Sequence, residues 1–131
     1  MMATEVFGIL VTHGSLGDEL VRTAEAIVGP QEGIAVLSNA GASLEDLASR
    51  LKGLIEGRAA RGALFLFVDL LGGSCGHACQ EILRVDPRTV LFSGVNLPMF
   101  LEFLHQRDRV GIEELRERLL AKGRNGIQCL S

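Results

Sequence analysis

Three polar residues that could take part in catalysis each stand directly after an apolar run of the sequence: His13, Asp69 and Asn96. If these runs are parallel strands of one sheet, their carboxyl ends meet at one edge, where α/β proteins bind ligands. A carboxylate beside a histidine favours the charged ring and fixes which nitrogen carries the proton, which leaves the other nitrogen free to attack. The pattern therefore predicts that His13 is a nucleophile oriented by Asp69, with Asn96 as a supporting residue.

A glycine-rich segment, Gly72-Gly73-Ser74, follows Asp69 closely and precedes a predicted helix. Glycines let backbone N–H groups approach an anion, and the start of a helix favours negative charge. We therefore expect Gly72, Gly73 and Ser74 to bind or support a phosphate. A histidine nucleophile, an orienting carboxylate and an anion site together indicate phosphoryl transfer, in which positioning and charge stabilisation supply most of the catalysis.

The elements that must position these residues alternate between strands and helices. Nearly continuous apolar sequence predicts buried strands over residues 6–12, 33–38, 63–68 and 89–95. Apolar residues at helical spacing follow each strand. The segments that begin at Ser15 and Ser43 both have the capping-box pattern of a helix start. Asn96 precedes Leu-Pro, so a simple helix cap is its alternative role.

The alternation of strands and helices predicts one α/β domain that spans residues 1–131. Its sheet is expected to be mostly parallel, with helices on both faces. The short tail over residues 127–130 follows the last predicted helix, and we predict that it forms a terminal edge strand.

Bulk properties limit the class of protein. A net charge of −3 gives no electrostatic reason to expect nucleic-acid binding. No apolar run approaches the roughly 20 residues of a membrane-spanning helix, and no signal peptide is evident, so we expect a cytoplasmic protein. The spacing of Cys75, His77 and Cys79 is not that of a zinc site, and buried small residues are the better interpretation of the two cysteines. We therefore predict no metal and no cofactor.

Three longer motifs occur in order along the chain: residues 8–14 (GILVTHG), residues 68–74 (VDLLGGS) and residues 94–99 (GVNLPM). Together they resemble the IIA component of mannose-family sugar phosphotransferase systems (PTS EIIA), and the likeness extends from Phe7 to the tail. This resemblance implies a three-layer α/β/α fold with a mostly parallel sheet in the order 2-1-3-4. It also implies an antiparallel C-terminal edge strand that is exchanged between the two subunits of a homodimer.

The resemblance further implies a phosphotransferase that forms a phosphohistidine intermediate. His13 is expected to accept a phosphoryl group from the histidine phosphocarrier HPr and to pass it to a histidine on a separate IIB protein. Asp69 matches the aspartate that orients the active histidine, and Ser74 matches the serine of the family's Gly-Gly-Ser-Pro loop. Contact with the membrane is expected only indirectly, through IIC and IID components, and the sugar is selected by other components.

Several positions depart from the family pattern. Cys75 stands where proline is usual, Leu70 and Leu71 replace a polar and an aromatic residue, and His77 replaces a frequent asparagine. These changes leave His13 intact but bear on the choice of partner, so one alternative is a regulatory module whose phosphorylation controls binding without transport. A less favoured alternative is a tetrapyrrole metal chelatase, in which the histidine binds the incoming metal and the glycine-rich loop has no evident purpose.

Overall fold

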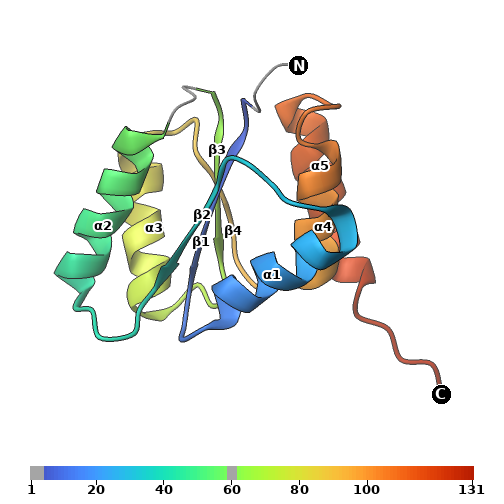
Figure 1. Cartoon of the computed structure of the whole chain (residues 1–131), viewed down its shortest axis with the longest axis horizontal. Coiled ribbons are helices and arrows are strands. Elements are labelled where there is room, and N and C mark those ends of the chain that lie inside the picture. The colour runs from blue at the N-terminus through green and yellow to red at the C-terminus, as the bar shows by residue number, and fades with distance from the viewer. Residues whose placement is uncertain (1–4, 59–61) are drawn as a thin grey trace.

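The computed structural model describes residues 5–58 and 62–131, and these form three layers (Figure 1). The strands of the central sheet are β1 (Phe7–Thr12), β2 (Ile34–Ser38), β3 (Leu64–Val68) and β4 (Val90–Phe92). The helices are α1 (Leu16–Val28), α2 (Leu44–Gly57), α3 (Gly73–Val85), α4 (Leu97–Gln106) and α5 (Ile112–Asn125). Helices α2 and α3 cover one face of the sheet, and α1, α4 and α5 cover the other. The α/β/α architecture is therefore confirmed.

No helix in the described part of the chain is long and apolar enough to cross a bilayer.

All four strands are parallel, and their order is β2-β1-β3-β4, as expected. Val11 of β1 pairs with Val68 of β3, so the chain leaves these two neighbouring strands at the same level. The fourth strand is shorter than predicted. It ends at Phe92 because the chain turns at Gly94, whose φ of +66° lies in the left-handed region that a strand does not continue.

Both faces of the sheet are buried, which explains why its central strands are almost wholly apolar. In β3 the side chains of Phe65 and Phe67 point to the layer of α4, whereas those of Leu64, Leu66 and Val68 point to α2 and α3. All five residues of this strand are buried. The sheet is thereby fixed from both sides, and the residues that follow its strands have a rigid base.

The two predicted helix caps differ in outcome. Ser43 forms the capping box with Asp46 that the sequence predicts. The side chain of Ser15 makes no such bond. Instead, the buried hydroxyl of Thr12 accepts a hydrogen bond from the N–H of Gly17 at 2.7 Å. The end of β1 is thus tied directly to the first turn of α1, across the turn that contains His13.

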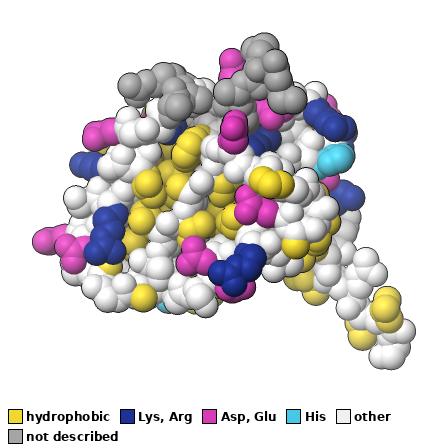
Figure 2. Space-filling model, in the orientation of Figure 1, with side chains coloured by type: hydrophobic (Ala, Val, Ile, Leu, Met, Phe, Trp, Pro, Cys, Tyr) yellow, Lys and Arg dark blue, Asp and Glu magenta, His cyan; other side chains and the backbone are white. Residues whose placement is uncertain are grey.

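The predicted C-terminal edge strand does not form within this chain. Residues 127–131 have no strand pairing in the structure, and Ile127 and Leu130 are 80% and 91% exposed. The reason is the position of α5, which packs beside α4 in one helical layer, so that the tail leaves the domain away from the sheet (Figure 1). Figure 2 shows hydrophobic side chains standing out from this tail.

Candidate active site

The ends of β1 and β3 bring two of the predicted residues together. His13 follows β1 directly and Asp69 follows β3 directly, and the pairing of these strands places the two residues side by side. Gly14, the residue after the histidine, has a φ of +56° and donates its N–H to Asn39 at 3.1 Å. The turn after β1 is therefore held by the end of β2 as well as by β3.

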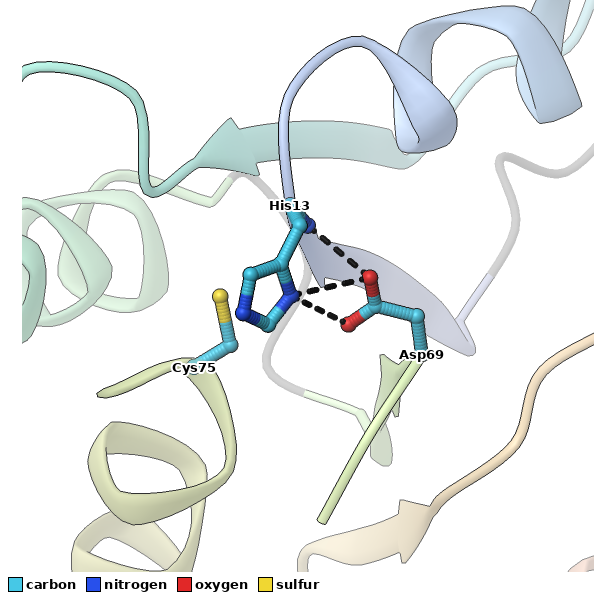
Figure 3. A group of neighbouring side chains, drawn as sticks. All are labelled: His13, Asp69 and Cys75. Atoms are coloured by element: carbon cyan, nitrogen blue, oxygen red, sulfur yellow. Dashed lines mark hydrogen bonds and ion pairs between the residues drawn. The ribbon is translucent and has the colours of Figure 1, made fainter. Parts of the chain in front are cut away.

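Asp69 contacts both the backbone and the ring of His13 (Figure 3). One carboxylate oxygen accepts the backbone N–H of His13 at 3.0 Å. The ring nitrogen Nδ1 lies 3.0 and 3.1 Å from the two carboxylate oxygens. An ionised carboxylate only accepts hydrogen bonds, so in the neutral ring Nδ1 carries the proton and Nε2 keeps its lone pair. The His13 side chain is 41% exposed and that of Asp69 only 12%, so the ring is accessible while its orienting group is sheltered.

The electrostatics of Asp69 favour its charged form. Burial acts to raise the pKa of this carboxyl, but hydrogen bonds from the backbone N–H and ring of His13 and from the N–H of Leu70 outweigh it. The pKa of Asp69 therefore lies below its ordinary value. A carboxylate that stays ionised can support positive charge that develops on the ring during a reaction.

The start of α3 lies next to the free nitrogen of the ring. Gly73 has a φ of +82°, and a Cβ built on it would lie 3.9 Å from His13 Nε2. The N-cap residue Gly72 supplies no side-chain hydrogen bond, and the first turn of α3 contains no acidic residue. The positive end of the α3 dipole therefore lies near the ring, and no side chain caps the first N–H groups of this helix. Ser74, half-buried, sits in the same turn.

Close packing fixes this loop. Gly76, within the first turns of α3, passes so near the carbonyl of Leu71 that a Cβ on it would overlap that backbone. The close contact lies at Gly76, whereas a Cβ on Gly72 would meet no atom within 4 Å and one on Gly73 only the His13 ring. The sequence did not point to Gly76.

The side chain of Asn96 makes its hydrogen bonds to residues other than His13 and Asp69. Its Oδ1 accepts the N–H of Met99 at 3.0 Å, and its Nδ2 donates to the carbonyl of Gly123 at 2.8 Å. Both ends of the amide are therefore used to cap α4 and to bind α5, as in the alternative role considered from the sequence.

Cys75 is the residue that sequence reasoning missed as a neighbour of the histidine. Its Sγ, a nitrogen of His13 and an oxygen of Asp69 all lie within 4.8 Å of one another. The side chain is fully buried, as predicted. Burial, together with the charge of Asp69, raises the pKa of the Cys75 thiol, which a hydrogen bond from Ser74 only partly offsets. The available signal was its place in the first turn of the helix that follows the glycine-rich loop.

One family of known proteins matches most of this chain. The family model EIIA-man, described as PTS system fructose IIA component, matches residues 8–120. The chain belongs to this family. The matched range includes His13, Asp69 and the whole of α3, so the resemblance inferred from three motifs is confirmed. Proteins of this family are the phosphotransfer components named IIA.

Individual relatives agree with this assignment. The chain is 32% identical over 128 residues to the PTS system mannose-specific EIIAB component of Escherichia coli K12, covering 93% of this chain and 38% of that protein. It therefore spans about two fifths of that relative's length. It is 26% identical over 124 residues to the PTS system fructose-specific EIIA component of Bacillus subtilis 168, covering 94% and 85%. The crystal structure of component EIIA from Streptococcus agalactiae has the same fold, with a TM-score of 0.85 at 23% identity over 95% of this chain and 96% of that one.

Proposed function

We propose that this IIA component carries phosphoryl groups on Nε2 of His13, taking them from HPr and passing them to a IIB histidine for carbohydrate uptake or its regulation. In the first step the Nε2 lone pair attacks phosphorus, and the phosphorus–nitrogen bond in HPr breaks with its electron pair returning to the HPr ring. The second step repeats this exchange with the IIB histidine as the attacking group. No net proton transfer is needed, because Nδ1 keeps its proton throughout.

The observation that carries the proposal is the contact of Asp69 with Nδ1 of His13. It leaves Nε2 as the nucleophile and places a negative charge beside the ring that becomes positive. The N-terminus of α3 supplies N–H groups on the Nε2 side, where the phosphoryl oxygens of a phosphohistidine have to be accommodated. Gly73 leaves room for that group because a side chain there would stand 3.9 Å from Nε2.

The test is phosphorylation by phospho-HPr, followed by mass spectrometry to locate the phosphate. The chain has only three histidines, so His77→Ala and His105→Ala are matched controls for His13→Ala. We expect the parent and both controls to gain one phosphate per chain and His13→Ala to gain none. Phosphate on His77 or His105, or a parent protein that no phosphorylated donor modifies, contradicts the proposal. Heteronuclear NMR of the modified ring then determines whether the phosphoryl group is bound to Nε2, as proposed, or to Nδ1.

The tail supports a further part of the proposal, a homodimer. Ile127 and Leu130 are exposed on a segment that finds no partner strand in its own chain. We propose that this segment adds to the sheet of a second copy, as the family resemblance implies. Sedimentation of the full chain and of a variant truncated after Gly126 checks this: we expect a dimer and a monomer, respectively. A truncated variant that still dimerises contradicts the exchange.

Regulation of a protein partner is the second candidate function. It is supported by the loop that follows Asp69. Leu70 and Leu71 are 62% and 49% exposed directly after Asp69, so two large apolar side chains border the reactive histidine. Such a border suits a protein partner that distinguishes the phosphorylated from the free ring. Capture experiments with phosphorylated and unphosphorylated protein separate the outcomes: a IIB protein indicates transport, and a signalling protein indicates regulation.

A further inference from the structure

The structure joins three metal-binding groups that are far apart in the sequence. His13 ends the first strand, Asp69 ends the third, and Cys75 lies in the first turn of α3, yet their donor atoms lie within 4.8 Å of one another (Figure 3). We propose that these three side chains bind a thiophilic divalent cation, Zn²⁺ in the first place, and that the bound metal blocks the histidine.

The donor set and its dimensions suit zinc. Imidazole nitrogen, thiolate sulfur and carboxylate oxygen are the three donor types that bind Zn²⁺, at about 2.0–2.3 Å. In a tetrahedral site such bonds place the donors roughly 3.3–3.8 Å apart. The separations here are no greater than 4.8 Å, so shifts on the order of 1 Å bring the donors onto a metal. Three protein ligands leave a fourth position for water, the arrangement of an open zinc site.

The surroundings hold two of the three donors in place. The Asp69 carboxylate is fixed by the N–H groups of His13 and Leu70 at 3.0 and 2.9 Å. Cys75 is fully buried in a helix whose start is locked by the contact between Gly76 and Leu71. A cation therefore enters from the side of the His13 ring, which is 41% exposed. Binding releases the thiol proton of Cys75 to solvent.

The consequence for activity rests on the proposed phosphoryl transfer. Asp69 faces Nδ1, so a metal shared by Asp69 and His13 binds this nitrogen. The proton of Nδ1 then moves to Nε2, which loses the lone pair that attacks phosphorus. Metal and phosphoryl group therefore exclude each other, so thiophilic metal ions inhibit this carrier and phosphorylation expels them.

The test measures metal binding without any phosphoryl donor. Co²⁺ is titrated into the unphosphorylated full chain carrying Cys129→Ser, which removes the exposed thiol, and Zn²⁺ is then used to displace it. We expect one Co²⁺ per chain and a thiolate-to-cobalt charge-transfer band. Cys75→Ala should abolish the band and weaken binding by more than the roughly 10–100-fold that loss of an outer-shell partner costs. Cys79→Ala removes another buried thiol of the same helix and should change neither.

Two results overturn the proposal: no charge-transfer band in the Cys129→Ser protein, or equal Co²⁺ affinity with and without Cys75. If circular dichroism shows that Cys75→Ala is unfolded, Cys75→Ser and His13→Ala replace it, and each should lose affinity by the same criterion. A protein that binds Co²⁺ but accepts no phosphate refutes the proposed function and leaves the metal site standing. A protein that accepts phosphate but binds no metal supports the proposed function and refutes the metal site.

Discussion

Replacing Asp69 with asparagine tests the central contact of the site while preserving its shape. The carboxylate accepts hydrogen bonds from the backbone N–H of His13, from its ring and from the N–H of Leu70, at 2.9 to 3.1 Å. An amide of the same size can still accept some of these bonds, but it carries no charge. It also has an NH₂ group that can face Nδ1, and this forces the ring proton onto Nε2.

The expected loss has two parts. A hydrogen bond to a charged group contributes about 1 to 1.5 kcal/mol more than a neutral one, so loss of charge beside the developing imidazolium slows transfer by about tenfold. The change of tautomer slows phosphoryl transfer more than the loss of charge does, because it removes the lone pair of the nucleophile. An Asp→Asn change beside the histidine of a serine-protease triad lowers turnover by about 10⁴-fold. We therefore expect Asp69→Asn to accept phosphate from phospho-HPr at least about 100-fold more slowly than the parent.

The assay is the initial rate of phosphate incorporation from phospho-HPr under single-turnover conditions. Asp86→Asn is the matched control, because it removes one carboxylate charge at the far end of α3 from His13. The control should retain the parental rate. If Asp69→Asn also stays within about threefold of the parent while folded, the contact between Asp69 and Nδ1 does not set the tautomer and the reasoning is wrong.

The same variant gives a stability prediction with a defined pH dependence. The pKa of Asp69 is lower in the folded protein than its ordinary value of 3.8, so the ionised group stabilises the fold above that pH. This contribution is lost as the pH falls through the folded-state pKa. The difference in unfolding free energy between the parent and Asp69→Asn should be about 1–2 kcal/mol at pH 7 and should shrink below about pH 4. Urea unfolding at both pH values measures it, and a gap that widens in acid contradicts the assignment.

Three further substitutions test the elements around the site. Gly73→Ala forces a side chain into φ +82°, which should cost about 1–2 kcal/mol in urea unfolding and slow phosphorylation; an unchanged rate argues against an anion site beside Nε2. Thr12→Val removes the 2.7 Å bond to the N–H of Gly17 and should cost about 1–3 kcal/mol by the same measurement. Arg107→Leu removes a buried side chain whose guanidinium donates hydrogen bonds to several backbone carbonyls, and thermal unfolding should show a loss of stability of about 3 kcal/mol or more.

Much of the fold was predictable because the chain repeats a simple pattern. Apolar strands followed by amphipathic helices indicate a parallel sheet, and the buried β3 is as apolar as its covered position requires. The predictions that differed concern groups with competing partners. Ser15 has the sequence of a helix cap, but the hydroxyl of Thr12 reaches the same helix start from the neighbouring strand. The tail has the sequence of a strand, but its own sheet lies out of reach.

In the candidate site, too, some features follow from local sequence and others depend on contacts between distant parts of the chain. Local residue types are enough to predict that His13 and Asp69 follow strands and that glycines precede a helix, because such residues mark strand ends and helix starts. The pairing of Val11 with Val68, which brings the carboxylate of Asp69 to Nδ1 of His13, is seen in the folded sheet alone. In the folded domain Asn96 also caps α4, and the side chain of Cys75 lies beside that of His13. These distances depend on strand register and helix orientation, which the packing of the whole domain sets and no local stretch of sequence encodes.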